Sequence, residues 1–347
     1  MSGLSFERET VTSPNFVVPT FVFLGLLQTM NRYLRISMGF QRPHTDVRCC
    51  WRPFAEGVLA GNPIYVRPVV DNKPPLFELL NVAVAATGRY LFVFLLLVGL
   101  ANAATGILVW RVGVQRAHPR AGLLAGGLFL ASVPITGGMV VNVRSFAIAG
   151  ILLSLTLSHP VARGVAIAAA GLFSQHAVFA IPAVAYDRIS DFDRRRRLRW
   201  LGLYALSGGG LVAASFAFVY IVWGWQSLQG GLFWTFLVAQ RYATNPSVPS
   251  LIGDTQGWLL QHYFFSLRHL VVLVPAAVVG YVAATEADPK RFVRSSNGLV
   301  LTAGLLALSM SVPLFVRAYR AYWLYPMPFL ALLAALGIRE LFTVGEP

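Results

Sequence analysis

Acidic residues are scarce in this chain, yet four of its fourteen fall in one short stretch between His44 and Asn81. An ionised carboxylate on a loop can act as a general base that removes the proton from an attacking hydroxyl. Asp46, the first of the four, is our candidate for this catalytic role. Taken by itself, without the residues around it, a lone aspartate in a loop is more often a helix cap or a turn residue. The four acids are Asp46, Glu56, Asp71 and Glu78.

Three basic residues have positions suited to binding a phosphate group. Lys73 precedes the Pro74-Pro75 pair, which excludes helical geometry at Lys73 and ends the loop stiffly. Arg317 and Arg320 are three residues apart, so in a helical turn both guanidinium groups could approach one phosphate. The alternative is that all three are interfacial anchors whose side chains reach toward lipid headgroups.

Five other polar or aromatic residues could contact a donor or an acceptor. His44 lies two residues before Asp46, and this spacing allows a shared divalent cation without specifying one. The sequence therefore leaves the cofactor open. His176 could contact an acceptor or a phosphate, or it could form a hydrogen bond with a purely structural role. The five candidates are His44, Asp71, His176, Tyr319 and Tyr322.

Composition indicates the kind of protein in which these residues lie. The chain has 347 residues, of which 56% are hydrophobic and only 12% are charged, and its mean hydropathy is +0.63. These values are typical of an all-α polytopic membrane protein whose main partner is the lipid bilayer. The net charge of +14 falls in short basic clusters between apolar runs, a pattern that argues against nucleic acid as a partner.

Apolar runs predict about ten membrane spans in a single domain, 1–347. A span needs roughly 17 to 25 residues, although some of the runs are shorter. The run 164–186 is interrupted by the triplet Ser174-Gln175-His176, which would be costly against lipid in the middle of a membrane. We therefore expect two short helices there, meeting at a membrane surface. The runs are 16–30, 89–110, 121–141, 146–157, 164–186, 200–223, 269–285, 298–316 and 322–338.

The distribution of arginine and lysine predicts the orientation. Two short helices over 164–186 place the cluster from Arg194 to Arg197 on the cytoplasmic side, as the positive-inside rule requires. Arg32 and Arg35 then lie outside, against the rule, but the larger cluster outweighs them. This topology predicts a multi-pass protein of the cell membrane with both termini in the cytoplasm. Its outer loops would span about 39–88 and about 224–268.

The first of these loops carries a resemblance to a known family. The elements TD, VLAGNPIY and VDNKPPLFELLN follow one another in an order and spacing that resemble the first extracytoplasmic loop of the GT-C superfamily of membrane glycosyltransferases. Two later segments, AGLFSQHAVFAIPAVAYD and RAYRAYWLYPMPFLALLAALG, are similar to a short helix pair and a closing span in that family. The chain departs from many members in two respects: we expect no soluble C-terminal domain, and there is one acid where they have a pair, so metal dependence stays open.

The resemblance implies an inverting glycosyltransferase. Such an enzyme would transfer a hexose, with mannose expected, from a polyprenyl (dolichyl) phosphate to a glycan or glycoprotein acceptor on the outer face. Asp46 would be the base, and Lys73, Arg317 and Arg320 would bind the donor phosphate. The physical requirements agree, because a single displacement needs one base, cations for the departing phosphate and an apolar groove for the lipid.

Two other classes of function are compatible with the sequence. A transporter or flippase for lipid-linked sugars would share the basic groove but would need no carboxylate base, and the lack of charged residues in the middle of the spans argues against ion-coupled transport. A non-catalytic membrane subunit of a glycosylation complex is the other possibility, which the short length of the chain favours slightly. Sugar transfer by the purified chain alone would distinguish an enzyme from both of these alternatives.

Overall fold

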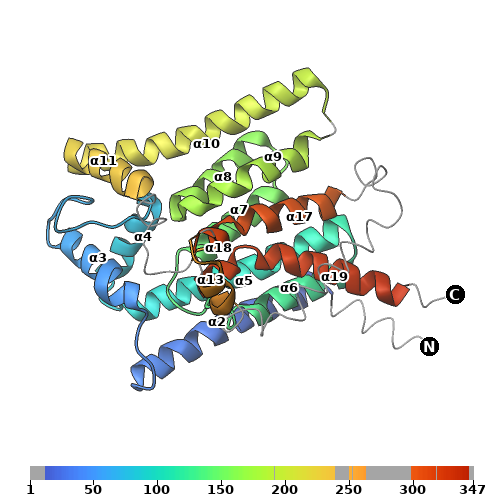
Figure 1. Cartoon of the computed structure of the whole chain (residues 1–347), viewed down its shortest axis with the longest axis horizontal. Coiled ribbons are helices and arrows are strands. Elements are labelled where there is room, and N and C mark those ends of the chain that lie inside the picture. The colour runs from blue at the N-terminus through green and yellow to red at the C-terminus, as the bar shows by residue number, and fades with distance from the viewer. Residues whose placement is uncertain are drawn as a thin grey trace.

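The computed structural model describes residues 12–190, 192–238, 250–251, 253–262, 298–317 and 319–343 (Figure 1). Within these ranges the chain is helical and forms no β-strand. Three helical segments are long and apolar enough to cross a membrane: α5 (Tyr90–Arg116), α10 (Arg194–Trp223) and the continuous stretch Gly298–Val316. The predicted all-α membrane class thus agrees with the structure in its coarse form. The predicted span over 269–285 lies outside the described residues.

The other described helices are shorter than these three segments, except for α2 near the start of the chain. A helix of 24 residues, α2, precedes the loop 39–88 and extends past the predicted run in both directions. Several helices begin with proline in their first turn, where the missing N–H has no intrahelical partner to lose. The elements are α2 (Pro14–Ser37), η1 (Val47–Trp51), α3 (Arg52–Leu59), α4 (Pro75–Ala86), α6 (Pro119–Ser132), α7 (Arg144–Thr156), α8 (Pro160–Phe173), η2 (Gln175–Ala180), α9 (Ile181–Ile189), α11 (Trp225–Leu232), η3 (Phe233–Leu237), α13 (Thr255–His262), α17 (Gly298–Met310), α18 (Val312–Val316), η5 (Arg320–Leu324) and α19 (Met327–Thr343).

The predicted run 121–141 is not a continuous helix. Helix α6 ends at Ser132, and residues 133–143 form turns. Pro134 supplies the local reason, because it has no N–H to donate the next helical hydrogen bond and its ring clashes with the preceding turn. Gly137 then adopts a positive φ of 74°. The chain therefore changes direction at this point, where the sequence pattern predicts a longer span.

The segment 160–189 folds back on itself, as the interrupted apolar run predicts. Helix α8 ends at Phe173, and Ser174 is extended, with φ −151° and ψ 121°. Arg163, near the start of α8, donates hydrogen bonds of 2.9 Å to the carbonyl of Val184 and 3.0 Å to Asp187, both in α9. The start of α8 and the end of α9 therefore lie side by side. The prediction of two short helices is confirmed.

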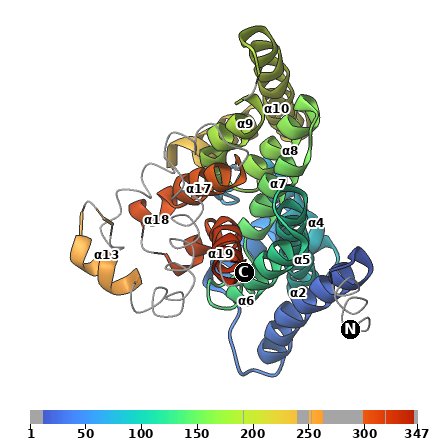
Figure 2. The same cartoon turned by 90° about the vertical axis from the view of Figure 1, so that its right-hand side faces the viewer.

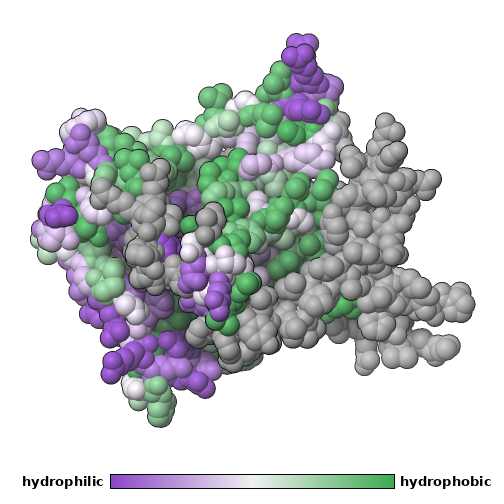
Figure 3. All heavy atoms as spheres, viewed as in Figure 1, coloured by the Kyte–Doolittle hydropathy of each residue, from purple (hydrophilic) through white to green (hydrophobic). Residues whose placement is uncertain are grey.

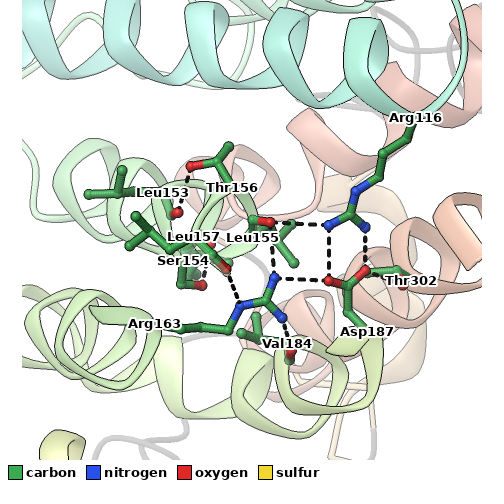
Figure 4. Close-up of polar contacts among 11 residues, drawn as sticks. Arg116, Leu153, Ser154, Leu155, Thr156, Leu157, Arg163, Val184, Asp187 and Thr302 are labelled. Carbon is green, nitrogen blue, oxygen red and sulfur yellow. Dashed lines mark hydrogen bonds and ion pairs between the residues drawn. The ribbon is translucent and has the colours of Figure 1, made fainter. Parts of the chain in front are cut away.

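Charged and polar contacts hold the ends of the hairpin in place (Figure 4). The Asp187 carboxylate, only 3% exposed, accepts hydrogen bonds from Arg163, from Arg116 at the end of α5, and from the Thr302 hydroxyl of α17 at 3.0 Å. Arg163 also bonds to the carbonyls of Leu155 and Leu157. One buried carboxylate thus connects α5, α8, α9 and α17.

Neighbouring helices form a row of α10, α8, α7, α5 and α2, as Figure 2 shows. Helix α6 packs on α5, and α19 packs on α6 and α17. Close approach in the row depends on glycine at two crossings. A Cβ on Gly25 of α2 would lie 2.6 Å from the carbonyl oxygen of Gly99, and one on Gly164 of α8 would lie 2.3 Å from that of Tyr204. Gly208 of α10 faces Gly164 at the second of these crossings.

The molecule has two distinct ends. We call the end that contains residues 39–88 the loop end; the opposite end holds the Asp187 contacts and the arginine-rich start of α10. On the face shown in Figure 3, hydrophilic side chains gather at the loop end and at the start of α10, and apolar ones predominate along the helices between them. The loop 39–88 and the arginine-rich start of α10, which are expected on opposite sides of the membrane, therefore lie at opposite ends of the molecule. Which end faces the cytoplasm stays a prediction.

Candidate functional site

An apolar groove of about 960 Å³ opens beside α8 and α10. Small residues from both helices, among them Gly171, Gly208 and Gly209, line it and leave its middle open. A volume near 1,000 Å³ is at the upper end of the usual range for ligand pockets. The other lining side chains of these two helices are Ile167, Ala168, Leu172, Tyr204, Ala205, Val212, Ala213 and Phe216. The groove is thus suited to a long apolar ligand.

Polar groups line part of the same groove and come from segments far apart in the sequence. Gln175 and His176 come from the tip of the hairpin, Thr235 from η3, and Arg317 from the end of α18. Arg317 is 4% exposed. A cation at an otherwise apolar groove gives it the chemical character required for a lipid with an anionic headgroup.

Lys73 lies beside the groove on a loop held from three sides. Its neighbour Pro74 lines the groove. The Tyr65 hydroxyl donates a 2.7 Å hydrogen bond to the Lys73 carbonyl, and the Gln175 amide donates one of 3.3 Å to the carbonyl of Asn72. The Lys73 ammonium donates to the side-chain oxygen of Asn72. The structure therefore brings Lys73 close to the hairpin tip.

Asp71 and Glu78 form a pair of carboxyl groups under this loop, of which Glu78 is buried and Asp71 half-buried. Glu78 is 0% exposed, and each residue has one buried oxygen without a hydrogen-bond partner among the described residues. Burial raises the pKa of Glu78 well above its ordinary value, and the charge of Asp71 raises it further. A proton on Glu78 would allow one of these two unpartnered oxygens to donate a hydrogen bond to the other carboxyl group. The sequence analysis gave Asp71 as a possible donor or acceptor contact and assigned Glu78 no role.

Asp46 lies at the start of η1 at the loop end. Its carboxylate is 46% exposed and approaches the His44 Nδ1 atom at 3.6 Å. His44 stacks on Trp51 with ring centroids 6.5 Å apart. Burial lowers the pKa of His44, Asp46 opposes this, and Arg144 adds to the lowering. A neutral imidazole beside an accessible carboxylate can accept or relay a proton.

Asp46 does not belong to the lining of the groove. Its connection to the Lys73 loop runs through packed side chains. Trp51 packs edge-on against Phe77 of α4 at 5.2 Å, and the Asn81 amide donates a 2.8 Å hydrogen bond to the Trp51 carbonyl. The two predicted functional residues therefore lie at the same end, on adjoining elements, without direct contact.

The two predicted phosphate-binding arginines do not share a helical turn. Arg317 has extended backbone, with φ −148° and ψ 134°, and follows α18, whereas Arg320 begins η5. The Arg320 guanidinium donates to the backbone carbonyls of Ile135 and Pro134, the latter at 3.3 Å. The expected helical spacing is wrong because Arg317 and Tyr319 both have extended backbone. Of the two arginines, Arg317 lines the groove and Arg320 does not.

Three of the candidate donor or acceptor contacts, His176, Tyr319 and Tyr322, lie in one aromatic cluster. The His176 ring lies 5.3 Å from that of Tyr322 and 5.6 Å from that of Tyr325. Tyr319 packs edge-on against Tyr322 at 5.4 Å. The Tyr325 hydroxyl is hydrogen-bonded to Ser174 at 2.5 Å. Tyr322 and His176 line the groove, so this cluster forms part of its polar wall.

Arg144, at the start of α7, is a site residue that the sequence analysis missed. Its guanidinium carbon lies 5.3 Å from the centroid of the Tyr322 ring. The sequence does offer a signal, because Arg144 is a single charge between two apolar runs with no acid beside it. No group of three or more His, Cys, Asp or Glu side chains suited to a metal ion occurs in the described ranges.

Comparison of the chain with protein-family models, with curated proteins and with solved structures finds no match. The resemblance to the GT-C superfamily therefore stays a prediction, and function has to be argued from the groove and the side chains around it.

Proposed function

We propose that the protein is an inverting glycosyltransferase that transfers a hexose, with mannose expected, from a polyprenyl (dolichyl) phosphate to a glycan or glycoprotein on the outer face of the membrane. The observation that carries this proposal is the apolar groove beside α8 and α10, whose polar wall includes Arg317 and adjoins Lys73. A ligand with a long apolar chain and an anionic head matches that combination.

The donor's two parts have separate binding groups in this proposal. The prenyl chain lies against the small residues of α8 and α10, where burial of its apolar surface stabilises binding by about 25 cal/mol per Å². The phosphate lies within reach of Lys73 and Arg317, whose charges stabilise it as it departs. Arg320, which bonds to the carbonyls of residues 134 and 135, positions its loop.

The reaction is a single displacement at the anomeric carbon. The acceptor hydroxyl loses its proton to Asp46, its oxygen forms a bond to the anomeric carbon, and the bond from that carbon to the phosphate oxygen breaks. The prenyl phosphate leaves with the electron pair, and the configuration inverts. The exposure of Asp46 lets a large acceptor approach from the solvent at the loop end.

Sugar transfer by the purified chain tests this proposal. Wild-type protein in proteoliposomes would receive radiolabelled dolichyl-phosphate mannose and a lipid-linked glycan extract, with other prenyl-phosphate sugars tried in parallel. Asp46→Asn should abolish transfer with normal insertion. Glu56→Gln is the matched control, because Glu56 belongs to the same loop but is half-exposed and pairs with Arg52.

Each outcome has a clear meaning. Transfer by wild type and Glu56→Gln but not by Asp46→Asn supports the proposal. Full activity of Asp46→Asn removes the proposed base. If wild type transfers none of the sugars offered, a flippase or a non-catalytic subunit becomes the better interpretation.

A further inference from the structure

Arg144 has no anionic partner in the described part of the chain. Its Nε atom is buried and makes no hydrogen bond there. None of the ion pairs between described residues includes it. A partly buried guanidinium without a counter-charge is destabilising, whereas a bound anion that accepts its hydrogen bonds offsets the loss of hydration. This arrangement is therefore suited to an anionic ligand.

The position of Arg144 relates it to both halves of the candidate site. It stacks on Tyr322, a side chain of the groove wall. Its charge also acts on His176, which lines the groove, and on His44, which is next to Asp46. The guanidinium is thus next to the polar wall of the groove and near enough to His44, beside the proposed base, for its charge to act there.

We propose that Arg144 binds the phosphate of the prenyl-phosphate donor, together with Lys73 and Arg317. This inference rests on the proposed function. The planar guanidinium binds two phosphate oxygens at once, and the Tyr322 ring fixes its plane. Lys73 can contribute only a point charge, so Arg144 gives the phosphate a defined orientation.

Binding of two ligands that differ only in the phosphate tests this role. The dissociation constants of a polyprenyl phosphate without sugar and of the same free polyprenol would be measured in detergent for wild type, Arg144→Gln and Arg144→Lys. The control is Arg89→Gln, which removes an exposed arginine at the start of α5. The decisive quantity is the ratio of the two constants, because a merely structural change would weaken both ligands alike.

We expect Arg144→Gln to lower the preference for the phosphate by roughly 10- to 100-fold, the range for a lost hydrogen bond to a charged group, while polyprenol binding stays constant. Arg144→Lys should give an intermediate loss, and Arg89→Gln none. An unchanged ratio in folded Arg144→Gln would overturn the inference. A wild type that binds both ligands equally would overturn it as well.

A second measurement needs no variant. Phenylglyoxal modifies accessible arginine side chains, and peptide mapping of the wild-type protein would follow its reaction at Arg144. Polyprenyl phosphate should slow that reaction and polyprenol should not; equal rates with both ligands would contradict the proposal. If the phosphate site is confirmed while wild type transfers no sugar, the proposed function fails and the anion site stands.

Discussion

Replacing Asp187 by alanine should destabilise the protein more than the same replacement of an exposed acidic residue. The carboxylate is 3% exposed and accepts hydrogen bonds of 3.0 Å from Arg163, Arg116 and Thr302. Removing one partner of a buried ion pair typically costs about 3 to 5 kcal/mol, because the remaining charge is left uncompensated.

The structure places the expected cost at the lower end of that range. Arg163 keeps hydrogen bonds to three backbone carbonyls after the substitution. Arg116 is 28% exposed and can turn toward water. We therefore expect Asp187→Ala to lower the free energy of unfolding by about 3 kcal/mol, a fall in Tm of about 4 °C for a chain of this size.

Asp193→Ala is the matched control for this measurement. Asp193 is at the same end of the molecule but is an exposed N-cap whose side chain accepts a hydrogen bond from the Arg196 amide at 2.9 Å. Loss of such a cap costs about 1 kcal/mol. Thermal unfolding of the detergent-purified variants compares the two. If Asp187→Ala costs no more than Asp193→Ala, the buried cluster does not fix the hairpin as we describe.

Two further predictions concern the groove and the carboxyl pair. Gly209→Leu should place a branched side chain in the groove and raise the KM for long-chain prenyl donors roughly tenfold, the scale of an overpacked site. Gly210→Leu is the control and should leave KM unchanged, because Gly210 does not line the groove. Equal effects of the two substitutions would place the lipid elsewhere. Glu78→Gln should remove part of the pH dependence of stability. Because folding raises the pKa of Glu78 above its ordinary 4.5, the folded protein binds this proton more tightly, and its stability falls as pH rises from 4.5 to the folded pKa. Tm values between pH 5 and pH 8 should therefore fall less steeply in Glu78→Gln than in wild type, and identical slopes would exclude a protonated Glu78.

Local signals in the sequence predict much of the fold. The triplet Ser174-Gln175-His176 reveals the hairpin because polar groups cannot be left against lipid. The two polar ends are predictable because charged residues gather beyond the apolar runs. The early end of α6 also has a local cause, Pro134. A prediction based on hydropathy misses it, because the apolar run continues past the proline.

The candidate site depends on contacts that the sequence does not specify. The groove exists because α8 and α10 meet closely at Gly164 and Gly208, while other small residues of the two helices leave space beside that crossing. This space depends on how the two helices pack against each other. The pairing of Asp71 with Glu78 and the stacking of Arg144 on Tyr322 join residues by tertiary folding. The assumption of a helical turn at Arg317 failed because three residues give too little pattern to distinguish helix from extended chain.

The most direct test of the account is to locate the lipid. A photoreactive polyprenyl phosphate would be crosslinked to the purified wild-type protein and the labelled peptides identified by mass spectrometry, with and without excess unlabelled donor. The account predicts labelling within Ile167–Phe179 and Tyr204–Phe216, the groove-lining segments of α8, η2 and α10, that the unlabelled donor suppresses. Labelling confined to other helices, or labelling that the donor does not displace, would contradict it.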